Sequence, residues 1–186
     1  MIEGMKKSST ASRSYDMPIT YIRHLLQIGA RWGVPEQELL IGSGLSHSAL
    51  EQPDARLTTR QAGLITRRLM RLSGRDDIGM EYGMLIRPTS HGFLGYAIMS
   101  CATLAEAMQV LHKYQSLHLN DFIVSVEVKD EEVIITVTES YNLGSMRQVF
   151  FEAFLVASCQ HMAYLIGREF TGLSVYVDWP RPAYFD

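Results

Sequence analysis

The spacing of apolar residues changes twice along the chain. Up to about residue 117 they recur every three or four positions, which predicts a series of helices. Alternation at every second position then predicts a hairpin over Phe122–Val137, and helical spacing returns over Met146–Ile166. Leu173–Val177 alternate once more, which predicts a third strand. This order of elements indicates an α+β fold, with helices packed on one side of an antiparallel sheet.

Capping and breaking residues set the expected limits of the helices. Thr58 with Gln61, and Thr103 with Glu106, have the three-residue spacing of a capping box. Residues 1–15 are polar and rich in serine, which indicates a disordered leader, and 16–186 contain no repeat or linker that would divide them into two domains. The helices expected before the hairpin are Asp16–Gly33, Pro35–Leu40, Ser46–Leu50, Thr58–Leu72, Ile78–Leu85, Gly92–Ser100 and Leu104 to about Leu117.

Composition narrows the class of protein. The chain is 47% hydrophobic and 20% charged, with a formal net charge of −3, so it has material for a core and no overall basic surface for nucleic acid. Two cysteines, Cys101 and Cys159, are too few for a disulfide framework, which favours a reducing cytoplasmic setting. We expect neither a signal peptide nor an apolar run long enough to cross a membrane.

Catalytic and metal-binding motifs are missing from the sequence. It has no Gly-x-Ser-x-Gly elbow and no glycine-rich phosphate loop, so we predict that the chain is not an enzyme. Cys159 and His161 are two residues apart and His112 and His118 are six apart, spacings that do not place two ligands on one helix face. We therefore expect no metal site and no cofactor, although His91, His112 and His161 are candidates in principle for a haem ligand.

Several segments in one order resemble the N-terminal effector-binding (arabinose-binding-type) domain of AraC-type transcription regulators. They are YIRHLLQIGARWGVPEQELLIGSGLS, LTTRQAGLITRRL, DIGMEYGMLIRPTSHGFLGYAIMSCATLAEAMQVLHKYQ and FFEAFLVASCQHMAYLIGRE. The resemblance covers about residues 17–186 and is sharpest at the Gly92-Phe93-Leu94-Gly95-Tyr96-Ala97 run.

The resemblance implies a fold similar to the haem–nitric-oxide-binding fold, with a pocket between helices and sheet, but it does not imply haem. It implies binding of a small-molecule effector, self-association as a homodimer, and contact with DNA only through a C-terminal helix-turn-helix domain that this sequence lacks. We therefore expect the chain to be a piece of a longer regulator. The alternatives are a free-standing small-molecule or haem-type sensor and a pure oligomerisation module.

Four polar residues are the predicted ligand contacts. Arg87 and His91 flank the sharpest motif, and Tyr96 lies within it. Arg147 is expected in the first turn of the long helix, where the helix dipole disfavours a cation, so it should have an anionic partner. An amino acid or carboxylic acid would pair with such an arginine.

Arginines also follow one expected helix, at Arg60, Arg67, Arg71 and Arg75. Their spacing of seven, four and four residues forms a stripe. The stripe is either a solvated face or a docking surface for a DNA-binding domain, a second protomer or an acidic tail.

Overall fold

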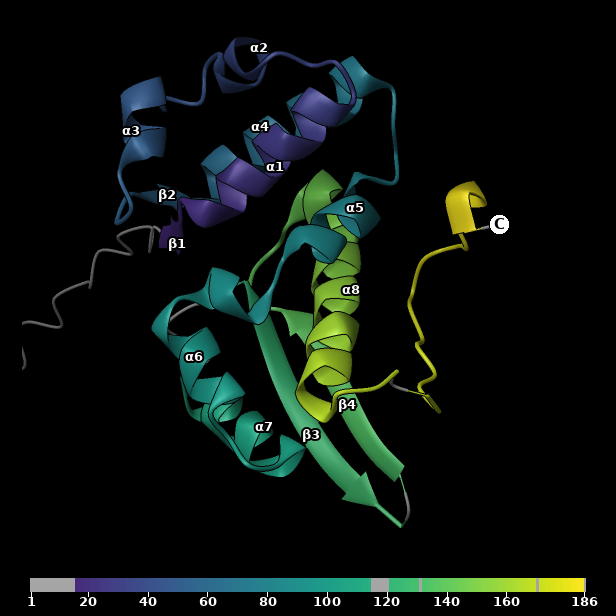
Figure 1. Ribbon diagram of the computed structural model, residues 1–186. Helices are drawn as coiled ribbons and strands as arrows, with labels where there is room; N and C mark the ends of the chain where they lie inside the picture. The colour runs from purple at the N-terminus through teal and green to yellow at the C-terminus, as the bar shows by residue number, and fades with distance from the viewer. Residues whose placement is uncertain (1–15, 115–120, 131, 170, 186) are drawn as a thin grey trace, which may run out of the picture.

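The computed structural model describes residues 16–114, 121–130, 132–169 and 171–185, and the expected leader lies outside them. Two layers are visible in Figure 1: α1 and α4, with α2 and α3 beside them, lie above α5, α8 and a long hairpin, and α6 and α7 lie next to the hairpin. The helices are α1 (Thr20–Arg31), α2 (Glu36–Leu40), α3 (His47–Glu51), α4 (Thr59–Ser73), α5 (Ile78–Leu85), α6 (Phe93–Met99), α7 (Leu104–Tyr114) and α8 (Arg147–Ile166), with 3₁₀ turns η1 (Pro88–His91), η3 (Gly144–Met146) and η4 (Ala183–Phe185).

Local signals explain most of these limits. The Thr58–Gln61 capping box forms as predicted, with the Gln61 amide N–H donating to Thr58 Oγ1 at 3.2 Å and the Thr58 amide donating to Gln61 Oε1 at 2.9 Å. At α7 the Glu106 amide donates to Thr103 Oγ1 at 3.1 Å, while the Glu106 carboxylate accepts from the Ala102 amide. The predicted end of this helix near Leu117 falls outside the described residues.

The sheet differs from the prediction. The described residues form two separate two-stranded antiparallel sheets, β1 (Asp16–Pro18) with β2 (Arg56–Thr58), and β3 (Phe122–Lys129) with β4 (Glu132–Glu139). Thus residues 16–18, predicted to begin the first helix, are a strand instead, because they pair with β2 and the helix starts only at Thr20. The mixed α+β class is confirmed, whereas the single sheet is not.

The predicted third strand is also wrong. Residues 173–177 have no strand partner and no regular structure, and Tyr176 is 92% exposed. Alternating apolar and polar residues suit a segment to a sheet, but a strand forms only where the edge of a neighbouring strand can share its backbone hydrogen bonds. The likeness to the haem–nitric-oxide-binding fold stays a prediction.

Close contact between α5 and α8 holds the lower layer together. A Cβ at Gly79 would lie 2.6 Å from the Val149 carbonyl oxygen, and one at Gly83 would lie 2.6 Å from that of Ala153. The absence of side chains at these two positions, one turn apart on α5, lets the helix backbones approach. The first half of α8 is buried as a result, and Phe151 also contacts Phe122 of β3 with ring centroids 5.0 Å apart.

Among the described residues, Gly144–Ile166 is long and apolar enough to cross a membrane by length and composition alone, so the prediction that no run reaches that length is wrong. The core helix of a soluble protein passes the same test. Here the helix packs on α5 and carries a buried carboxylate, since Glu152 is 2% exposed and its Oε1 accepts from the Tyr184 hydroxyl at 2.6 Å.

Candidate functional site

The short segment between α5 and α6, residues 86–91, is held from two sides. Pro88 begins the 3₁₀ turn η1, and the Arg87 amide donates to Ser90 Oγ at 3.1 Å, which closes the turn. The next helix packs directly on it, because a Cβ at Gly95 would lie 1.8 Å from the Pro88 carbonyl oxygen. The Gly92–Ala97 motif therefore serves to place α6 against this turn.

Helix α1 contacts the turn from the upper layer. Tyr21 and His24 are three residues apart and so lie on one face of α1. The Tyr21 hydroxyl is 2.6 Å from His91 Nδ1, and His24 Nε2 is 3.1 Å from Ser90 Oγ. Two side chains of one helix thus bind two consecutive residues of the turn.

Helix α8 contacts the same segment from the lower layer. His161 Nε2 donates to the Ile86 carbonyl at 3.2 Å, and Arg87 Nη1 donates to Gln160 Oε1 at 3.1 Å. The rings of His91 and His161 meet edge to face with centroids 5.1 Å apart. We call Tyr21, His24, Arg87, Ser90, His91, Gln160 and His161 the junction cluster, because they join the two layers.

The junction cluster has one permanent charge, on Arg87. Burial lowers the pKa of His24, and the charge of the nearby Arg87 guanidinium lowers it further. Burial also lowers the pKa of His161. The hydrogen bond to the Ile86 carbonyl opposes this shift, whereas the Arg87 charge adds to it. Burial and the Asp121 charge raise the pKa of Tyr21, so its hydroxyl keeps its proton and can donate to His91. In the described part of the chain, Arg87 forms no ion pair with a carboxylate.

The other predicted contacts lie elsewhere. Tyr96 is 58% exposed on α6. Arg147 binds Asp178 through both terminal nitrogens, at 2.7 and 3.0 Å, and its Nε is 3.7 Å from a Glu139 oxygen. These contacts raise the pKa of Arg147, chiefly through the Asp178 hydrogen bond, and lower that of Asp178. The anionic partner expected for Arg147 is thus supplied by the chain itself.

Five members of the junction cluster were not predicted as effector contacts: Tyr21, His24, Ser90, Gln160 and His161. The helical spacing of Tyr21 and His24 places both side chains on one side of α1. This spacing is the one sequence feature that links the two residues. Nothing in the sequence shows which turn they face.

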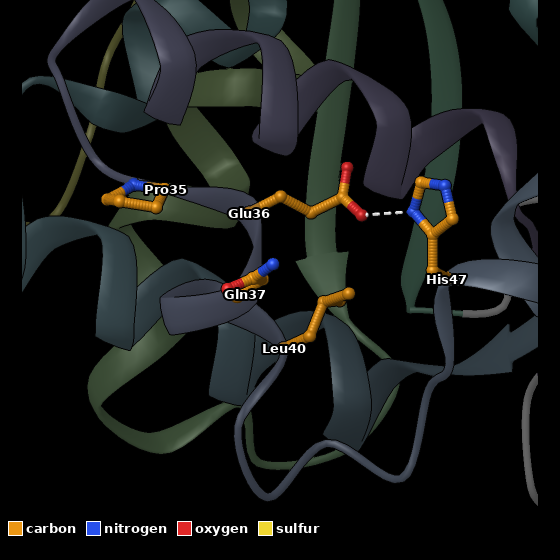
Figure 2. A pocket seen from close by; sticks show the side chains of 5 residues that line it. All are labelled: Pro35, Glu36, Gln37, Leu40 and His47. Carbon is orange, nitrogen blue, oxygen red and sulfur yellow. Dashed lines mark hydrogen bonds and ion pairs between the residues drawn. The ribbon is translucent and has the colours of Figure 1, made fainter.

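A separate shallow depression lies between α2 and α3 (Figure 2). Its lining is Pro35, Glu36, Gln37, Leu40 and His47, and a hydrogen bond of 2.6 Å joins Glu36 Oε1 to His47 Nδ1. The His47 side chain is 73% exposed and its ring is already bonded to Glu36, so the charges that line the depression are paired with each other.

The described residues offer little for catalysis or metal binding. They contain no group of three or more His, Cys, Asp or Glu side chains arranged to hold a metal ion. Burial raises the pKa of the half-buried Cys159, which keeps it a thiol rather than a reactive thiolate. The junction cluster combines one exposed cation, Arg87, with hydrogen-bonding groups from both layers.

Comparison with known proteins gives the family of this chain. Residues 33–186 match the family model of the N-terminal arabinose-binding domain of AraC transcription regulators. The chain belongs to this family, so it is a transcription-regulator domain and not an enzyme.

Three curated relatives agree with this family. The ornithine utilization regulator of Pseudomonas aeruginosa is 28% identical over 169 residues, which are 90% of this chain and 50% of the relative. Uncharacterized HTH-type transcriptional regulators of Mycobacterium bovis and Mycobacterium tuberculosis are each 26% identical over 136 residues, 73% of this chain and 40% of each relative. The chain therefore spans half or less of the length of these relatives.

Proposed function

We propose that this effector-binding regulatory domain binds a small anionic effector, an amino acid or a carboxylic acid, at Arg87 beside His91. The effector then controls DNA binding by a helix-turn-helix part of the whole regulator. We further propose that the domain acts as a cytoplasmic homodimer. The observation that carries the proposal is the environment of Arg87.

Arg87 is a cation whose side-chain hydrogen bond goes to a neutral group. It donates to the amide oxygen of Gln160, and its neighbours His24 and His161 are kept neutral by burial and by Arg87 itself. A carboxylate would give the guanidinium two hydrogen bonds to an anion in place of one bond to a neutral amide oxygen. Arg147 already has that arrangement with Asp178, so we now assign the predicted anion to Arg87.

The position of Arg87 also provides a route to control. Its segment is bound by Tyr21 and His24 of the upper layer and by Gln160 and His161 of the lower layer. An effector that replaces Gln160 as the partner of Arg87 releases one of these contacts. It thereby shifts the population between two placements of α1 and α8.

One relative favours an amino acid among the effectors that carry a carboxylate. The Pseudomonas relative is named for ornithine utilization, and ornithine carries the carboxylate that Arg87 would bind. Tyr96, on the exposed face of the neighbouring α6, would contact the part of the effector that projects away from the turn.

Isothermal titration calorimetry tests this proposal with ornithine, glutamate and short carboxylic acids, each compared with the analogue in which every carboxylate is replaced by an amide. Arg87→Gln removes the charge but keeps a hydrogen-bond donor, and it should weaken binding of the acid at least tenfold. The matched control is Arg71→Gln, an exposed arginine of α4, which should leave the affinity unchanged. Equal binding of acid and amide, or equal affinity in the wild type and Arg87→Gln, would refute the anion site.

A further inference from the structure

The outward face of α4 is a positively charged stripe. Arg60, Leu64, Arg67 and Arg71 are all exposed, and their spacing of four, three and four residues places them on one side of the helix, opposite the buried Ile65 and Leu69. The stripe is about 16 Å long at the rise of an α-helix. All 15 residues of α4, Thr59–Ser73, lack an acidic side chain, although the whole chain has a net charge of −3.

Three other arginines near the stripe are neutralised by carboxylates of the chain. Arg31 pairs with Glu81, Arg68 with Glu38, and Arg75 with Asp77 while stacking on the Trp32 ring. The predicted stripe therefore loses Arg75 to an internal ion pair. Within the described residues, Arg60, Arg67 and Arg71 form no ion pair, so three like charges on one face lack compensation.

The tip of the β3–β4 hairpin has the opposite charge. Asp130 and Glu132 are exposed and, among the described residues, form no ion pair. Just behind them the cross-strand pair Val128–Val133 is 74% and 62% exposed. An acidic end thus adjoins an uncovered apolar patch, a combination typical of an interaction surface.

We propose that the hairpin tip of one protomer docks on the α4 stripe of a second copy of this chain. Asp130 and Glu132 would face the stripe arginines, and the Val128–Val133 pair would cover Leu64, which is 38% exposed in the middle of the stripe. Helix α4 and the free end of the β3–β4 hairpin lie at opposite ends of the molecule in Figure 1, so the two segments cannot meet within one protomer.

Two-fold symmetry makes the contact reciprocal. In an antiparallel pair, each tip meets the stripe of the other protomer, which gives two identical contacts and a closed dimer. Exposed charges set partner choice and register, while the covered apolar residues supply affinity. The dimer should therefore weaken as salt rises. This inference rests on the proposed self-association and names the surface responsible for it.

Charge reversal in two separate variants tests the contact by sedimentation velocity. Arg67→Glu with Arg71→Glu makes the stripe acidic, and Asp130→Lys with Glu132→Lys makes the tip basic. Each variant alone should be monomeric, with the dimer dissociation constant raised at least tenfold. Mixed in equal amounts, they should form a heterodimer. In one contact the basic tip of the second variant meets the acidic stripe of the first, and in the other contact the acidic tip of the first meets the basic stripe of the second. Lys113→Glu with Arg168→Glu, two exposed cations elsewhere, should dimerise as the wild type does.

Each contrary outcome has a distinct meaning. A monomeric wild-type chain overturns the self-association and this surface together. A wild-type dimer that neither variant weakens, or variants that stay monomeric when mixed, overturn the surface alone. A stripe that binds duplex DNA instead, in a chain that stays monomeric, also overturns it. Effector titration of the same variants keeps the anion site separate, since neither surface includes Arg87. Circular dichroism confirms folding, and Arg67→Gln with Arg71→Gln replaces a reversal that fails to fold.

Discussion

Tyr21 and His91 are 70 residues apart in the sequence, and the hydroxyl of one lies 2.6 Å from Nδ1 of the other. The tyrosine belongs to α1 of the upper layer, and the histidine ends the turn that leads into α6. This hydrogen bond therefore ties the upper layer to the turn that carries Arg87.

Removal of the Tyr21 hydroxyl tests the strength of this tie. Tyr21 is 7% exposed, so Tyr21→Phe keeps the packed ring and leaves His91 Nδ1 without this donor. We expect the free energy of unfolding to fall by about 1 kcal/mol, the usual net value of a buried hydrogen bond. Urea denaturation measures it, with Tyr164→Phe as the control. Tyr164 is 59% exposed, and its variant should change stability by less than about 0.5 kcal/mol. Equal effects of the two substitutions would show that the Tyr21 bond contributes nothing.

The Arg147–Asp178 pair predicts a pH dependence at the acidic end. The Arg147 hydrogen bond lowers the pKa of Asp178 below its ordinary 3.8, so the pair stabilises the fold above that pH. The stabilisation is lost as pH falls through the folded-state pKa. We expect the melting temperatures of wild type and Asp178→Asn to differ at neutral pH and to converge well below pH 3.8. Because the pair is exposed, high salt should shrink the difference. A difference that persists unchanged in acid would mean that Asp178 acts through something other than its charge.

Local patterns predicted the helices well. The capping box at Thr58 and the glycines at the start of α6 are signals that lie within a few residues of the helix ends they determine. The strands needed information from further away. Asp16–Pro18 became a strand because Arg56–Thr58 lies beside it, and Leu173–Val177 did not because no edge of the described sheets accepts it.

The candidate site shows the same limit. Arg87 and His91 could be selected because they flank a distinctive motif, but their partners come from α1 and α8, and side-chain pairing across such distances leaves no periodic trace. Arg147 is the instructive case. Its conflict with the helix dipole correctly indicated an anionic partner, yet sequence alone could not distinguish an effector from Asp178, 31 residues further on.

Titration of His161 and of His47 should change the free energy of unfolding in opposite directions as the pH falls. Burial lowers the pKa of His161 below the ordinary 6.5, so the unfolded chain binds the proton first and stability falls as pH drops below 6.5. The Glu36 hydrogen bond raises the pKa of His47, so its contribution is complete below 6.5 and is lost as pH rises through the folded-state value.

Melting temperatures measured across this range separate the two effects. His161→Gln keeps a donor for the Ile86 carbonyl but cannot titrate, so it should lose less stability than the wild type on acidification. His47→Gln should lose more, because it lacks the Glu36 pair that protonation strengthens. If both variants follow the wild-type profile, neither ring titrates differently in the folded and unfolded states.

The α5–α8 contact gives the sharpest prediction for stability. Gly79→Ala places a methyl group 2.6 Å from the Val149 carbonyl oxygen, and that backbone atom cannot move without shifting α8. Overpacking of this kind should lower the free energy of unfolding by about 1–3 kcal/mol. Because α8 also carries Gln160 and His161, the same change should weaken effector binding.

Gly63→Ala is the matched control for that substitution. Gly63 lies within α4, and an added Cβ there would meet only ordinary contacts, 3.6 Å from Met146 Cγ and 4.0 Å from Phe150 Cζ. Alanine favours a helix interior over glycine, so Gly63→Ala should stabilise the fold by up to about 1 kcal/mol. Thermal and urea unfolding of the two variants should thus shift in opposite directions. A neutral Gly79→Ala would mean that α5 and α8 are further apart in solution, and the link from α8 to the Arg87 segment would lose its rigid support.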